Sequence, residues 1–84
     1  MGLSPALAAT FREAAAEVAH VNTENCVRLF FEEIGILFRN SKDRDPATLR
    51  FVELWGKVCD GCQEFTDDQI RFMQGFLLLK ADKL

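Results

Sequence analysis

Apolar residues recur every three or four positions in four separate segments of the chain, and a helix-start signal precedes each segment. This spacing places apolar side chains on one face of an α-helix, whereas a half-buried strand would need strict alternation. No segment alternates in that way. We therefore predict an all-α fold, a single domain with a compact bundle of helices over residues 5–21, 23–39, 46–60 and 67–82.

The predicted helix ends rest on local signals. Ser4-Pro5 and Asp45-Pro46 each place a capping residue before a proline at the first helical position. Asn22 and Thr23 are the cap candidates of the second helix.

The third and fourth helices carry further end signals. Thr66 and Gln69 have the spacing of a capping box, in which each side chain bonds the backbone of the other residue. Asp60-Gly61 is a stop signal, because glycine readily adopts the left-handed conformation that follows a helix.

The second segment carries more apolar residues than one buried face needs. One face holds Val27, Phe30, Phe31, Ile34, Leu37 and Phe38, and outside it lie Cys26, Leu29 and Ile36. A helix that is apolar on two faces usually has neighbours on both. Gly35 lies in the middle of this segment, where glycine lowers helix stability, and we expect a close helix crossing there.

The fourth segment is also broad. Its main stripe is Ile70, Met73, Phe76 and Leu77, and the stripe is widened by Phe72, Leu78 and Leu79. Two helices with double stripes exceed what a monomeric bundle hides, so we predict a homodimer or a complex with a larger protein. The predicted interface residues are Leu29, Ile36, Phe72, Phe76, Leu78 and Leu79.

Composition removes several classes of function. Thirteen acidic and ten basic residues give a net charge of −3, which disfavours a dedicated nucleic-acid binder. No apolar stretch approaches the roughly 20 residues that span a bilayer, and the N-terminal segment lacks a signal-peptide pattern. We expect a cytoplasmic protein without a membrane partner.

With one His and no Gly-rich phosphate loop, we predict no enzyme activity and no cofactor.

Cys59 and Cys62 form a C-x-x-C motif near the predicted end of the third helix. Buried free cysteines act as small apolar residues, and we interpret these as packing residues. A metal or thiol site on Cys59 and Cys62 is an alternative, for which Cys26 and His20 are the additional ligands available. Glu17 and His20 have the spacing of a carboxylate–histidine pair, but one such pair does not make a di-iron site in a monomer.

Arg39, Lys42, Arg44 and Arg50 cluster around the polar segment that links the second and third helices. A dimer that presents two such clusters to phosphates is a second alternative, a DNA-binding regulator that uses residues 39–50. The interleaved acidic residues Asp43 and Asp45 oppose it.

The preferred interpretation is a small non-enzymatic regulatory protein that acts by protein–protein interaction. It docks on a larger partner, for example as an anti-activator of a transcription regulator or as a chaperone or adaptor. The aromatic-rich stripes support this interpretation, because an apolar patch that stays exposed on a protomer is typical of an interface.

Overall fold

The all-α fold is confirmed. The computed structural model describes residues 5–20, 23–42, 44–62 and 64–83, and these contain helices and connecting turns but no strand. After the first helix, the chain forms one continuous helix in three segments: α2, a π-helical turn and α3. The elements are α1 (Pro5–Val18), α2 (Thr23–Leu29), the π-helical turn (Phe30–Ile34), α3 (Gly35–Asn40), α4 (Pro46–Cys59) and α5 (Asp67–Asp82).

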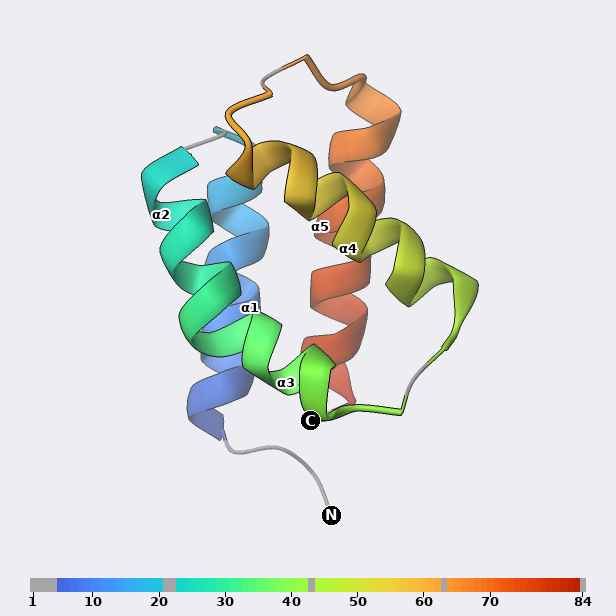
Figure 1. Ribbon diagram of the computed structural model, residues 1–84. Helices are drawn as coiled ribbons and strands as arrows, with labels where there is room; N and C mark the ends of the chain where they lie inside the picture. Colours follow the sequence, from blue (N-terminus) through green and yellow to red (C-terminus); the bar gives the residue numbers. More distant parts are fainter. Residues whose placement is uncertain (1–4, 21–22, 43, 63, 84) are drawn as a thin grey trace.

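The helices pack in two layers (Figure 1). α1 and α5 lie side by side and antiparallel, and α2 to α3 runs along α1. α4 crosses the bundle at a steep angle and contacts both α2 and α5. The amide Nε2 of Gln74 donates a hydrogen bond to the backbone oxygen of Ala15 at 3.1 Å, which ties α5 to α1.

The core draws buried apolar residues from α1, α2, α4 and α5, and an aromatic cluster within it lies where α4 meets α2 and α5. Phe51 stacks on Phe76 with ring centroids 4.6 Å apart and contacts Trp55 at 5.3 Å. The indole Nε1 of Trp55 donates a hydrogen bond to the backbone oxygen of Cys26 at 3.1 Å. Within the described part of the chain, no buried side-chain nitrogen or oxygen lacks a hydrogen-bond partner. The core is therefore apolar with its polar atoms satisfied.

The signals around the loop between α4 and α5 are confirmed. Gln69 N–H donates to the Thr66 hydroxyl at 3.1 Å, and Thr66 N–H donates to the Gln69 side chain at 3.0 Å. At the end of α4, Cys62 N–H donates to the Lys57 carbonyl at 2.9 Å and Gly61 N–H donates to the Val58 carbonyl at 3.0 Å. This pair of bonds is a Schellman motif, with Gly61 at φ +80°.

The other end signals have mixed outcomes. Asp45 is at the predicted N-cap position before α4, but its side chain makes no capping hydrogen bond. The position of the predicted cap is therefore correct, and the predicted side-chain bond is wrong. Pro46 does occupy the first turn. α1 ends at Val18, within the predicted range 5–21. The predicted caps Ser4 and Asn22 lie outside the described residues.

The π-helical turn explains Gly35. The backbone N–H of Gly35 donates to the carbonyl oxygen of Phe30, five residues earlier. A Cβ at Gly35 would lie 2.5 Å from that oxygen, and the three nearest atoms all belong to Phe30. The predicted close helix crossing is therefore wrong as the reason for this glycine, which is required by the backbone of its own helix.

The same turn corrects the predicted faces of the second helix. A wider turn adds a residue, so Leu29 and Ile34 both face the core although five positions separate them. Cys26 and Leu29 are buried, whereas Phe31 is 53% exposed. The prediction that grouped Phe31 with Ile34 on one face and left Leu29 outside that face is wrong, because it assumed 100° per residue throughout.

No helix in the described ranges is both long enough and apolar enough to span a membrane.

Candidate functional site

Five large apolar side chains remain about half exposed in the described part of the protein. They occupy two regions, one around α3 and α4 and the other on α5. Their exposed fractions are 53% for Phe31, 48% for Ile36, 54% for Leu49, 46% for Leu78 and 53% for Leu79. Single exposed apolar residues are ordinary, so what distinguishes a candidate site is the shape of the surface beside them.

Phe31 and Leu49 lie at a pocket of about 360 Å³ between the α2–α3 helix and the first half of α4. We call it the α3/α4 pocket. Most of its lining is aromatic or aliphatic, Gly35 contributes only backbone, and two residues are arginines. The lining residues are Phe30, Phe31, Gly35, Phe38, Arg39, Arg44, Thr48, Leu49 and Val52. Its size and apolar character are those of a binding cavity with a few polar groups.

The aromatic walls of the pocket are braced by the core. Phe30 stacks on Trp55 at 6.2 Å and meets Phe31 edge-on at 5.4 Å. Phe38 contacts Phe51 at 5.7 Å and Phe76 at 6.1 Å. Because these rings contact buried neighbours on their inner side, the walls are held in place before any ligand arrives. A preformed pocket costs less ordering entropy on binding than a flexible one.

Both arginines of the pocket come from the chain that leaves α3. Arg39 is in the last turn of α3, and its Nε donates a hydrogen bond to the Gly35 carbonyl at 3.3 Å. Arg44 follows in the connection to α4. The backbone bond fixes the Arg39 side chain along the pocket wall, and its terminal nitrogens carry further donors.

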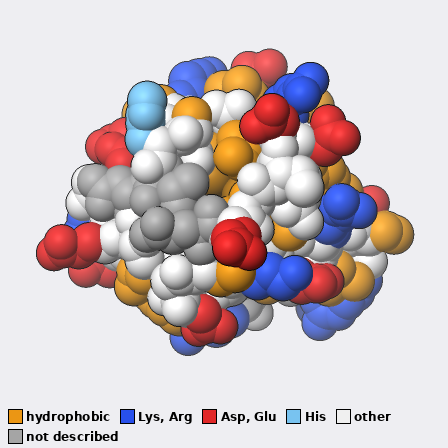
Figure 2. All heavy atoms as spheres, turned by 90° about the horizontal axis from the view of Figure 1, so that it is seen from above, with side chains coloured by type: hydrophobic (Ala, Val, Ile, Leu, Met, Phe, Trp, Pro, Cys, Tyr) orange, Lys and Arg blue, Asp and Glu red, His pale blue; other side chains and the backbone are white. Residues whose placement is uncertain are grey.

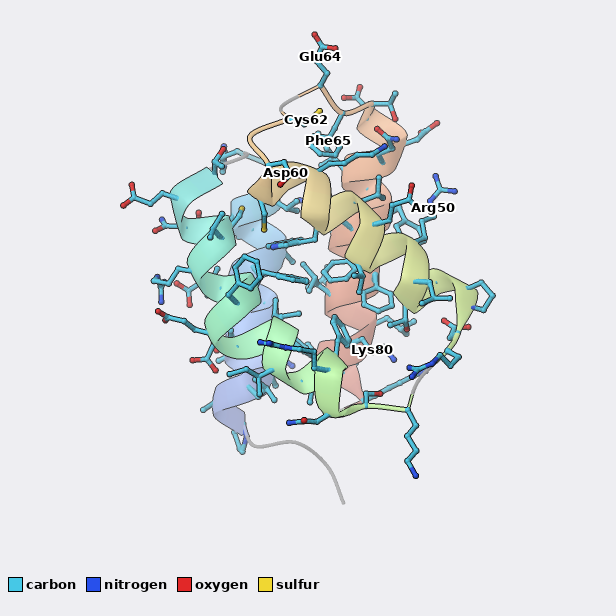
Figure 3. All side chains as sticks on the ribbon, in the orientation of Figure 1. Arg50, Asp60, Cys62, Glu64, Phe65 and Lys80 are labelled. Atoms are coloured by element: carbon cyan, nitrogen blue, oxygen red, sulfur yellow. The ribbon has the colours of Figure 1, made fainter. Side chains whose placement is uncertain are left out.

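The residues of the predicted basic cluster have different neighbours in the structure. Arg39 and Arg44 line the apolar pocket, whereas Arg50 lies over the ring of Phe72 on α5, 5.2 Å from its centroid. Figure 3 shows Arg50 projecting from α4 on the side of α5. Lys42 is exposed in the connecting segment. Acidic and basic side chains are also interspersed on the face seen in Figure 2.

The six predicted interface residues lie in different environments. Leu29 and Phe76 are buried, with 3% and 5% exposure, and belong to the core. Phe72 is half-buried between Phe76, at 6.4 Å, and Arg50. Ile36, Leu78 and Leu79 are the three that remain exposed.

A second, shallower hollow of about 310 Å³ lies between α1 and α5. Leu78 lines it together with the small residues Ala15 and Ala16, and its polar lining residues are Arg12 and Gln74. We call it the α1/α5 groove. Small residues beside an exposed leucine allow a helix from another molecule to approach closely.

Phe31 and Leu49 are the site residues that the sequence pattern missed. The helical spacing places Phe31 in a stripe with core residues, and nothing in the composition separates Leu49 from the apolar residues of α4 that are buried. The extra residue of the π-helical turn and the crossing of α4 bring them together in the lining of one pocket.

The cysteines occupy three environments. Cys26 is buried, Cys59 is half-buried and Cys62 is exposed in the loop after α4 (Figure 3). Predicted core packing therefore fits Cys26 and Cys59 but does not extend to Cys62. Burial raises the pKa of Cys26 from 9.0 to about 11, with further contributions from Glu17 and Cys59. Burial and then Asp60 raise the pKa of Cys59.

A raised pKa keeps a thiol protonated and lowers its nucleophilicity and its affinity for metals. In the ranges that the structure describes, no three His, Cys, Asp or Glu side chains gather as a metal site. Glu17 is half-buried in the last turn of α1, and His20 is exposed in the turn that follows.

No protein-family model, curated protein or solved structure matches this chain.

Proposed function

We propose that this protein is a small non-enzymatic regulator that docks on a larger protein through the α3/α4 pocket. The observation that carries this proposal is the pairing of two half-exposed apolar side chains, Phe31 and Leu49, with a preformed apolar hollow. An anti-activator of a transcription regulator and a chaperone or adaptor are the two forms of regulator that fit such a docking role.

Burial of the exposed part of Phe31 and Leu49 supplies binding free energy. Complete burial of such a side chain yields about 1.5–3 kcal/mol, and each is about half exposed here. Docked partners usually fill a pocket with one or two apolar anchors that dominate the affinity. The braced walls of the α3/α4 pocket suit an anchor of that kind.

The positions of the other candidate groups favour protein docking over the two alternatives. A DNA-binding surface needs several cations directed to one row of phosphates, and Arg50 is engaged over Phe72. A reactive thiol needs a lowered pKa, whereas the pKa values of Cys26 and Cys59 are raised.

We further propose that the protein is a homodimer and that its second copy packs on the α1/α5 groove. Leu78 and Leu79 are half exposed on α5, and Leu78 lines a hollow walled by alanines. The surface for the second copy and the surface for the larger partner would then lie on different helices, so the protein would bind both at the same time.

Photo-crosslinking in the native host tests the docking site. A crosslinking residue at position 49 should trap a larger protein, whereas one at position 78 should trap a second copy of the chain. Leu49→Asp should abolish capture of the larger protein and keep self-association, and Leu78→Asp should do the reverse. Because both leucines are about half exposed, neither change should alter stability by more than about 0.5–1 kcal/mol. Equal loss of partner capture in both variants would contradict the assignment of the pocket.

A further inference from the structure

The α3/α4 pocket combines apolar walls with two cationic side chains. Its walls are apolar, and its two charged lining residues, Arg39 and Arg44, come from the same stretch of chain after the middle of α3. Among the described residues that line it, none is acidic. Asp45 is exposed next to Arg44 in the chain but does not line the pocket. Among the described lining residues, a ligand that fills the pocket therefore meets two arginines and no carboxylate.

The volume indicates the size of the apolar part of that ligand. A dry cavity of about 150 Å³ holds one benzene ring, so the observed 360 Å³ has room for two large side chains. On a partner helix, two such side chains one turn apart lie on the same face. A pair of anchors on an amphipathic helix matches the pocket better than a single small side chain.

The two arginines of the pocket indicate the charge of the polar part of the ligand. Arginine binds carboxylates through paired N–H donors, and such bonds are stronger when the surroundings are apolar. Arg39 is held by its Nε bond to Gly35, which leaves the terminal guanidinium nitrogens as further donors. The net charge of −3 repels an acidic partner only over distances that salt screens, whereas contact with the arginines is local.

Resting on the proposed docking function, we propose that the α3/α4 pocket binds an acidic amphipathic helix. Two bulky apolar residues of that helix, one turn apart, enter the pocket. A Glu or Asp one turn further on pairs with Arg39 and Arg44. The partner class is thus defined by an apolar pair followed by carboxylates on one helical face.

Fluorescence anisotropy with three synthetic helical peptides tests this. All three carry Phe and Leu one turn apart, and the next turn carries Glu in one, Gln in the second and Lys in the third. The full-length protein should bind the Glu peptide roughly tenfold more tightly than the Gln peptide, and the Lys peptide most weakly. The preference should shrink at high salt.

Replacing the two pocket arginines by glutamates tests whether their charge determines which peptide binds best. The double variant Arg39→Glu with Arg44→Glu should reverse the order, so that the Lys peptide binds best. The control of equal net charge is Lys57→Glu with Arg71→Glu, two exposed residues that do not line the pocket, and it should keep the original order. Circular dichroism checks that each variant is folded.

The outcomes separate the two proposals. If all three peptides bind equally and Leu49→Asp abolishes binding, the pocket docks helices but the acidic-partner proposal is overturned. If no peptide binds, the acidic-helix proposal is overturned, and crosslinking from position 49 still tests docking separately. If Leu49→Asp instead abolishes self-association in sedimentation, a second copy occupies the pocket and the proposal is overturned.

Discussion

The indole nitrogen of Trp55 donates a buried hydrogen bond, 3.1 Å long, to the backbone oxygen of Cys26. The two residues are on α4 and α2, so this bond joins the crossing helix to the long helix beside the α3/α4 pocket. Trp55 is fully buried and stacks on Phe30, which is a wall of that pocket. The bond thus satisfies the one polar atom of the largest core side chain and helps to position Phe30 in the lining of the α3/α4 pocket.

Trp55→Phe removes the donor and part of the ring. We expect a loss of about 1–4 kcal/mol in the free energy of unfolding, from the missing hydrogen bond and the cavity left behind. Urea denaturation followed by far-ultraviolet circular dichroism measures it, because the substitution removes the only tryptophan that fluorescence would report. A loss below about 0.5 kcal/mol would contradict the importance assigned to this bond.

Gly35→Ala should lower the free energy of unfolding, whereas Gly75→Ala should raise it. Alanine at position 35 places a Cβ 2.5 Å from the Phe30 oxygen, so the π-helical turn must shift, at a cost of about 1–3 kcal/mol. Gly75 is exposed in α5, and a Cβ there would have no neighbour within 4 Å. Alanine at position 75 should therefore stabilise the protein by about 0.5–1 kcal/mol. Thermal unfolding of the two variants beside the wild type gives the comparison. Equal effects at both positions would show that the turn does not require glycine.

The pH dependence of stability should show the buried thiol of Cys26. Its pKa rises from 9.0 to about 11 on folding, so between these values the folded protein keeps a proton that the unfolded chain has released. The stabilising contribution is therefore complete below pH 9 and is lost as the pH rises toward 11. Urea denaturation from neutral to alkaline pH should show this fall in the wild type and a smaller one in Cys26→Ala.

Thiol labelling should follow exposure. At mildly alkaline pH, Cys62 should react first with a maleimide or disulfide reagent, Cys59 more slowly, and Cys26 only on unfolding, because Cys62 is exposed and Cys26 is fully buried. Peptide mapping after timed quenching gives the order. Fast labelling of Cys59 at neutral pH would contradict the raised pKa of that thiol.

Self-association should respond to charge on α5. Leu78→Glu introduces a carboxylate into the α1/α5 groove, and it should weaken a dimer at least roughly tenfold while leaving the helix content unchanged. Ile36→Glu, at a residue that is exposed on α3 and outside the groove, separates the two faces. Sedimentation velocity over a range of concentrations reports both. A wild type that stays monomeric at high concentration would refute the dimer.

Local signals in the sequence correctly predict the two helix ends around the loop between α4 and α5, although the predicted cap at Asp45 is wrong. The capping box of Thr66 and Gln69 and the stop at Gly61 depend on nearby residues, so the pattern of a few positions determines them. The faces of the second helix depend on a hydrogen bond from Gly35 to Phe30 that skips one residue more than usual. No periodicity rule contains that shift, so helical spacing exchanges Leu29 and Phe31 between core and surface.

The candidate site is also predictable only in part from the sequence, because it depends on how the helices pack. The sequence predicts exposed apolar side chains, and Ile36, Leu78 and Leu79 are exposed. The α3/α4 pocket depends on where α4 crosses the long helix, and this crossing is set by packing among Phe30, Phe51 and Trp55. In the sequence, Arg39 and Arg44 belong to a basic cluster around a polar linker, and only the folded arrangement of α3 and α4 places them with aromatic residues in one pocket lining.

The π-helical turn at Phe30–Ile34 also bears on how the chain tolerates a change of length. Removing one residue from an ordinary helix rotates every later side chain by about 100°, which in α4 would turn Phe51 or Trp55 out of the core. Within this turn one residue is already in excess of α-helical register, so deleting Glu32 or Glu33 leaves the flanking halves facing as they do now. The shortened chain would keep its bundle while Phe31 and Gly35 lost their present arrangement at the pocket. We therefore expect that deletion of one of these two exposed residues changes the α3/α4 pocket and leaves the helical bundle folded.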